Sequence, residues 1–171
     1  MEVYQLLPKV GIGPVKFDMT RAEVYAAMPV APSSVLPEGV PPGEENQTFY
    51  YHNSYVVAYS ASDGKVIQIG VDVNKEISVH YRNIDIFNIR VEELIEILGK
   101  ETPYDKDDFE LGYSYLFPEY ALALYRPSLP EDFKDLLGGD DFKYYEEDYR
   151  RSHYFKSLQL VANSDIFYST I

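Results

Sequence analysis

Apolar and polar residues alternate over long stretches of the chain, and this two-residue period is typical of β-strands. From Gln47 onward, runs rich in β-branched and aromatic residues are separated by the turn sequences His52-Asn53-Ser54 and Ser62-Asp63-Gly64. The Asp-Gly pair suits the positive φ angles of a tight hairpin. The pattern therefore predicts a short strand or extended lead-in within 1–18 and strands at about 47–52, 54–61, 65–73 and 76–82.

Two segments instead show the apolar spacing of an amphipathic helix. The first is predicted over about 20–28, because Thr20 and Glu23 have the spacing of a capping box and prolines follow at once. The second is predicted over about 91–98, where four aliphatic residues share one face and Gly99 stands at the position of a left-handed C-terminal cap.

The second half of the chain predicts further strands at about 111–117, 120–126, 156–161 and 166–168. Two segments show neither the two-residue period of a strand nor the apolar spacing of an amphipathic helix. The run 30–45 is rich in proline and glycine and is predicted to be a surface loop. Residues 127–153 form an insert that contains prolines, the pair Gly138-Gly139 with a short helix before it, and a run of acids and tyrosines.

The helix openings of the two halves match position by position, since Phe17–Val24 aligns with Phe87–Leu94. The hairpins that follow each opening also correspond in their aromatic and aliphatic residues. We therefore predict an α+β fold, a tandem repeat of a short helix packed on an antiparallel sheet of three to four strands. The first repeat spans 1–82 and the second spans 83–171, with the insert 127–153, and the two form one compact unit.

Composition limits what the protein does. The chain of 171 residues is 46% hydrophobic and can bury a sizeable core. It contains no cysteine, which rules out disulfides, thiolate nucleophiles and cysteine-based zinc sites. The first twenty residues lack the basic start and apolar stretch of a secretory signal, and no apolar run has membrane-spanning length. These features predict a cytoplasmic protein.

Charge narrows the choice of partner. The formal net charge is −13, and it is uneven: residues 1–100 carry −5, residues 101–148 carry −10, and the remainder carries +2. Such a surface repels nucleic acid phosphates and anionic lipid and attracts a cationic protein. We therefore expect a cationic protein partner, with neither nucleic acid nor a membrane as ligand.

No motif indicates catalysis. His52, His80 and His153 are scattered and do not have metal-ligand spacing. The stretch Asp105–Glu110 lacks the glycine and the distal glutamate of a calcium loop. Gly11–Pro14 lacks the backbone donor and the lysine of a phosphate-binding loop, and no Gly-x-Ser-x-Gly elbow is present. We therefore expect no metal, no cofactor and no enzymatic activity.

Acids and tyrosines coincide in the second half, and this combination is typical of interfaces with cationic partners. Ordinary surface solvation explains the same acids, and for residues 140–149 the two interpretations have equal weight. The candidate partner-binding residues are Asp105, Asp107, Asp108, Glu110, Asp140, Asp141, Tyr144, Tyr145, Glu146, Glu147, Asp148 and Tyr149.

The motifs Gly-Ile-Gly-Pro-Val-Lys-Phe-x-Met-Thr-x-x-Glu-Val at 11–24 and Ile-Phe-x-Ile-x-x-Glu-Glu-Leu at 86–94 resemble small bacterial immunity proteins of polymorphic toxin systems. The helix opening and hairpin are also similar to the repeated module of the β-lactamase inhibitory protein and of outer-membrane assembly lipoproteins. The chain departs from that module at Asp18 and Asn88, where glycine is usual, and it lacks a lipoprotein cysteine.

The resemblance implies a cognate toxin, commonly a nuclease or another enzyme with a basic cleft, that is neutralised by tight occlusion. In this hypothesis the loop 104–113 and the insert segment 140–149 form one acidic, tyrosine-rich face that imitates the phosphates of the toxin's substrate. Two alternatives remain open. The first is a general interaction module without a toxin, and the second is a small hydrolase with a concave pocket.

Overall fold

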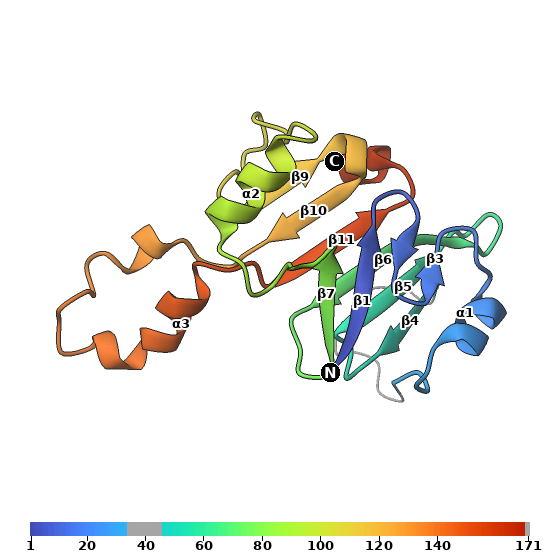
Figure 1. Ribbon diagram of the computed structural model, residues 1–171, viewed down its shortest axis with the longest axis horizontal. Helices are drawn as coiled ribbons and strands as arrows, with labels where there is room; N and C mark the ends of the chain where they lie inside the picture. Colours follow the sequence, from blue (N-terminus) through green and yellow to red (C-terminus); the bar gives the residue numbers. More distant parts are fainter. Residues whose placement is uncertain (34–45, 170–171) are drawn as a thin grey trace.

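The computed structural model describes residues 1–33 and 46–169 (Figure 1), so most of the surface loop predicted over 30–45 lies outside the described residues. The described chain is α+β, as predicted, with two β-sheets and few helices. The strands are β1 Glu2–Leu7, β2 Gly11–Ile12, β3 Val15–Lys16, β4 Gln47–Tyr50, β5 Tyr55–Tyr59, β6 Val66–Asp72, β7 Ile77–Tyr81, β8 Ile84–Asp85, β9 Ser114–Phe117, β10 Leu122–Tyr125 and β11 Ser157–Val161. The α-helices are α1 Arg21–Ala27, α2 Val91–Gly99 and α3 Glu146–Arg151.

The larger sheet has six strands in the order β4-β5-β6-β11-β10-β9, and every neighbouring pair is antiparallel. Its central pair joins β6 to β11, with Val71 opposite Leu158. Strands from both halves of the chain therefore share one sheet. The predicted arrangement, in which each half has its own sheet of three to four strands, is not what the structure shows.

The smaller sheet has the order β3-β2-β1-β7-β8, and its central strands β1 and β7 run parallel, with Val3 beside Ser78. Parallel neighbours need a long crossover. Here the crossover contains β2, β3, α1 and β4–β6, so the chain builds half of the larger sheet before it returns to pair with its first strand. The two sheets have five and six strands, more than the three to four predicted for each.

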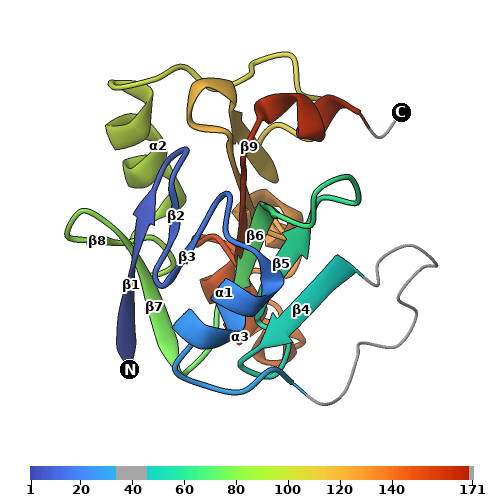
Figure 2. The same ribbon diagram turned by 90° about the vertical axis from the view of Figure 1, so that its right-hand side faces the viewer.

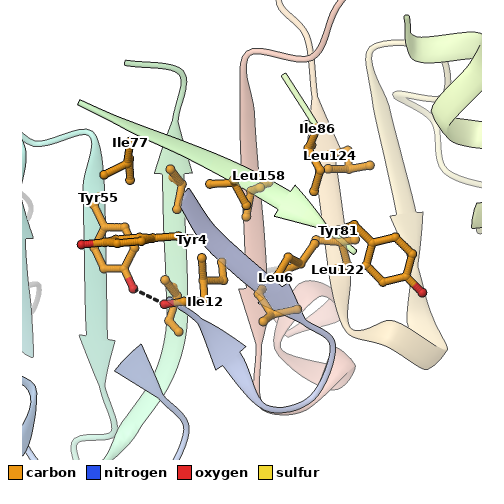
Figure 3. Close-up of a cluster of buried hydrophobic side chains, with 14 of the residues drawn as sticks. Tyr4, Leu6, Ile12, Tyr55, Ile77, Tyr81, Ile86, Leu122, Leu124 and Leu158 are labelled. Carbon is orange, nitrogen blue, oxygen red and sulfur yellow. Dashed lines mark hydrogen bonds between the residues drawn. The ribbon is translucent and has the colours of Figure 1, made fainter. Parts of the chain in front are cut away.

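The core lies between the two sheets (Figure 3). Alternate residues of the strands point into it: Tyr4 and Leu6 from β1 meet Tyr55 from β5 and Leu158 from β11, and all four are at most 5% exposed. The hydroxyl of Tyr55 donates a hydrogen bond of 2.7 Å to the carbonyl oxygen of Ile12. Burial raises the pKa of this hydroxyl well above its ordinary value, so it remains a donor.

Helices α1 and α2 begin where the sequence predicts. Thr20 and Glu23 form the predicted capping box, and α2 buries its predicted apolar face. Two local predictions are wrong. Helix α2 ends at Gly99, its C-cap Lys100 lies in the right-handed region, and Gly99 does not adopt a left-handed conformation. Residues 166–168 form part of a 3-10 helix, Ser164–Tyr168, in place of a strand.

Replacing Tyr55 by phenylalanine should lower the free energy of unfolding by about 1–2 kcal/mol, because the carbonyl of Ile12 then loses its donor inside the core. Tyr50→Phe is the matched control, because its hydroxyl is buried without a hydrogen-bond partner among the described residues. Loss of the Tyr50 hydroxyl should leave the free energy of unfolding unchanged or raise it. Urea denaturation measures both variants, and equal losses would mean that the Tyr55 hydrogen bond contributes nothing.

Candidate functional site

The six-stranded sheet has one covered face and one open face. Figure 2 shows β1, β7 and α2 on one side of this sheet, where the core lies. On the other side, no helix or strand of the described residues is layered over the central strands. The outward positions there include small or polar residues, such as Gly70 on β6, Ala123 on β10 and Gln159 on β11, beside larger apolar ones such as Val56 and Leu116.

Three hollows of about 220, 280 and 660 Å³ follow one another across the open face, and all three include Gln159. The largest lies at the β9 end. Its floor consists of Ser114, Leu116, Ala123 and Gln159, one wall is the loop 105–110, and the other wall is formed by Phe167 and Tyr168. We call this hollow the acidic groove. Four carboxylates line it, from Asp105, Asp107, Asp108 and Glu110, and none of the described lining residues is a base.

The acidic wall of the groove is held in a defined shape. The Asp105 amide donates to the Leu116 carbonyl of β9 at 2.8 Å, and the Tyr168 hydroxyl donates to the Asp105 carboxylate at 3.0 Å. Burial and the nearby Asp105 carboxylate raise the pKa of Tyr168. Asp108 accepts the Glu110 amide at 3.0 Å. These hydrogen bonds connect the wall to β9 and to Tyr168.

At the tip of the wall, Phe109 is 96% exposed. An aromatic ring held in water beside carboxylates is a typical anchor for a partner surface. Among the described residues, no group of three histidine or acidic side chains is placed to hold a metal ion.

The insert 127–153 projects away from both sheets as a separate lobe, which we call the arm (Figure 1, orange). It contains two 3-10 turns, Pro130–Phe133 and Phe142–Tyr144, followed by α3. Its own small core is aromatic. The Tyr149 ring makes edge-on contacts with Phe133, Phe142 and His153 at centroid distances of 5.8, 5.6 and 5.1 Å.

The predicted partner-binding residues of the arm separate into two groups. Tyr149 is partly buried in the arm's core, and the exposed Glu147 accepts two hydrogen bonds from Arg150, which lower the pKa of its carboxyl. The others lie on the exposed surface of the arm: Asp140, Asp141, Tyr144, Tyr145, Glu146 and Asp148. Glu147 and Tyr149 thus have partners within the chain.

The predicted single face does not form. Figures 1 and 2 both show the 105–110 loop at one end of the molecule, while the 140–149 segment lies on the projecting arm. A hydrogen bond from the Tyr113 hydroxyl to Asp132 connects the segment that follows the 105–110 loop to the start of the arm. Whether either patch binds a partner stays a prediction.

A second polar cluster lies at the C-terminal end of α2. The Glu101 carboxylate accepts hydrogen bonds from the hydroxyls of Tyr81 and Tyr120, at 2.5 and 2.7 Å, and from Arg82 at 2.6 Å. These donors lower the pKa of Glu101. The hydrogen bonds tie β7 and its following turn to the segment after α2, so we assign this cluster a structural role.

Sequence reasoning missed several residues of the acidic groove, namely Phe109, Phe167, Tyr168 and the polar floor. A usable signal was present for the floor. In the strands at 122–125 and 157–161, Ala123, Ser157 and Gln159 alternate with leucines, which marks one face as exposed. The sequence could not show that the other described elements leave that face uncovered.

Comparison with models of protein families gives no match for this chain, and neither a curated protein nor a solved structure is found to resemble it. Among the helices formed by the described residues, none combines the length and the apolar character needed to cross a bilayer.

Proposed function

We propose that the protein is a non-enzymatic binding protein that holds a cationic segment of another protein in the acidic groove. In line with the resemblance of its motifs, we propose that the partner is a bacterial toxin domain and that the protein is its immunity protein. One observation carries the proposal: the hollow at the β9 end of the open sheet face is lined by four carboxylates and by no described base.

The charge of this groove supports capture by electrostatic steering. Carboxylates of one sign over a concave surface focus the field and raise the rate at which a cationic protein arrives. Phe109 and Tyr168 stand beside the carboxylates as aromatic anchors. Rings of this kind bury much area at small rotamer cost. Steering and anchoring together fit an inhibitor that covers a basic cleft.

Catalysis is a weaker interpretation of the same groove. General acid and base chemistry needs groups with different proton affinities held close together. Two carboxylates can form such a pair when their environments differ, but nothing in the described lining singles out two of the four carboxylates. The proposed action is therefore occlusion of the partner, without a reaction.

We also infer that the six-stranded sheet comes from a duplicated unit. Each half contains a helix followed by a three-stranded meander, α1-β4-β5-β6 and α2-β9-β10-β11. In the sheet the two meanders meet through their last strands, which gives the symmetrical order β4-β5-β6-β11-β10-β9. Thr20 and Arg90, which align in the sequence match, are the N-caps of α1 and α2. In this scheme the strands come from a duplication, and the arm is an addition to the second unit.

The proposed function is tested by growth rescue joined to a binding measurement. The toxin candidate is the protein encoded beside this chain in its host, expressed from an inducible promoter. Co-expression of the wild-type chain should restore growth, and the purified pair should form a complex that added salt weakens. The proposal is overturned if the wild-type chain neither restores growth nor binds that candidate.

A further inference from the structure

A buried arginine connects the arm to the acidic wall of the groove. Arg126 directly follows β10 and is only 4% exposed. Its Nε donates to the Gly112 carbonyl at 2.8 Å, and its terminal nitrogen Nη1 donates to the Ser152 carbonyl at 2.9 Å. Its backbone amide donates to the Tyr113 carbonyl at 2.8 Å. One residue thus holds the loop after the groove wall and the last part of the arm.

The choice of arginine has a physical meaning. The nearest carboxylate, Glu92, lies 3.7 Å away and is well exposed, so the buried charge is only partly compensated. An aliphatic side chain would fill the same space without the desolvation penalty. The planar guanidinium, however, binds two carbonyls at a fixed separation, which an aliphatic or a lysine side chain cannot do. Arg126 therefore fixes the position of the arm relative to the loop that follows the groove wall.

A second connection lies at the start of the arm. The Tyr113 hydroxyl lies 3.1 Å from each carboxylate oxygen of Asp132, and one of those oxygens also accepts the Leu129 amide at 2.8 Å. The arm is therefore fastened at its beginning by Tyr113 and near its end by Arg126. Both connections lead to the loop 105–113, whose first part is the wall of the acidic groove.

We infer that one cationic partner contacts the acidic groove and the arm at the same time, and that Arg126 is the positioning residue that fixes the distance between the two contacts. This rests on the proposed function of the groove. The arm presents charge of the same sign, from Asp140, Asp141, Glu146 and Asp148, beside Tyr144, which is 72% exposed. The partner is therefore a protein with two separate basic patches.

Two synthetic peptides test this inference. One carries a single block of five lysines, and the other carries two such blocks joined by a glycine-serine linker. The linker is varied from about 5 to about 30 residues, because effective concentration is maximal when its reach matches the span between two sites. Isothermal titration at low salt should show an affinity optimum at one linker length, about 100-fold tighter than the single block.

Variants of the chain identify what sets the optimum. Asp140→Lys with Asp141→Lys should remove the gain from the second block and leave the single block bound at the groove. Arg126→Lys should flatten the dependence on linker length, because charge is kept while the fixed fork is lost. If the Arg126→Lys variant does not fold, Tyr113→Phe serves as a second variant, because it removes the hydrogen bond from the Tyr113 hydroxyl to Asp132. This change should also broaden the optimum in linker length.

Two outcomes distinguish failure of this inference from failure of the proposed function. If the single block does not bind the wild-type chain, the groove itself is not a site for cationic protein. If the single block binds and its affinity falls with Asp107→Lys and Glu110→Lys, the groove stands. In that case, equal affinities for all linker lengths would overturn the two-site inference.

Discussion

Replacing Asp107 and Glu110 by lysine is expected to slow association with the cationic partner by about one to two orders of magnitude at low salt. Both side chains are exposed, and both line the acidic groove. The change replaces two attractive charges by two repulsive ones at the place where the partner arrives. Dissociation should change less, because rim charges act mainly on the encounter. Stopped-flow or surface-based kinetics measures both rates.

The control for this experiment is Glu93→Lys with Glu96→Lys. These two acids have the same spacing in the sequence, and their replacement changes the net charge by the same amount. They lie exposed on α2, which is on the covered side of the sheet. Steering by total charge would slow both variants alike, whereas a local site would slow only the groove variant. Raising salt to 0.5 M should bring the two association rates together. Equal rates at low salt would remove the groove from the binding surface.

The elements that could be predicted are those that depend on residues close together in the sequence. The Thr20-Glu23 spacing is enough to start α1, because the capping box satisfies backbone donors within one turn. The hairpin between β5 and β6 follows from its turn sequence, in which Gly64 adopts a positive φ of 72°. The parallel pairing of β1 with β7 has no local signal, since Val3 and Ser78 are 75 positions apart.

The error at residues 166–168 has a related cause. Ile166, Phe167 and Tyr168 have high strand propensity, but a strand also needs a free neighbour in the sheet. Strand β11, which precedes them, already pairs with β6 and β10, so residues 166–168 cannot form a hairpin with it. Asn163 instead starts a 3-10 helix by accepting the Asp165 amide. That helix places Tyr168 at the groove.

The candidate site was predictable in charge but not in shape. Composition located the acids of both patches, because charge is a property of the sequence itself. It could not separate Tyr149, around which the arm packs, from Tyr144, which points into solvent. Nor could it show that the acids near 105 border a hollow while those near 140 lie on a projecting lobe. Those distinctions depend on tertiary packing.

Replacing Phe155 by alanine is expected to cost about 3–5 kcal/mol of folding free energy. Phe155 is fully buried where the arm returns to β11, and its ring meets Tyr115 edge-on at 5.9 Å. It belongs to the main core between the sheets. Its truncation leaves a cavity that the surrounding strands cannot close, and the thermal midpoint should fall by roughly 10 °C. Urea denaturation and calorimetry measure the loss.

Phe142→Ala removes the same atoms from the arm, where Phe142 is only partly buried and contacts Tyr149. Because the arm packs on itself and is held to the sheets by hydrogen bonds, this change should cost about 1 kcal/mol or less in global unfolding. Amide exchange should accelerate in 130–151 alone. Equal global losses for the two variants would mean that the arm and sheets unfold as one unit. The arm would then serve the stability of the fold, and the need for Arg126 to position it would disappear.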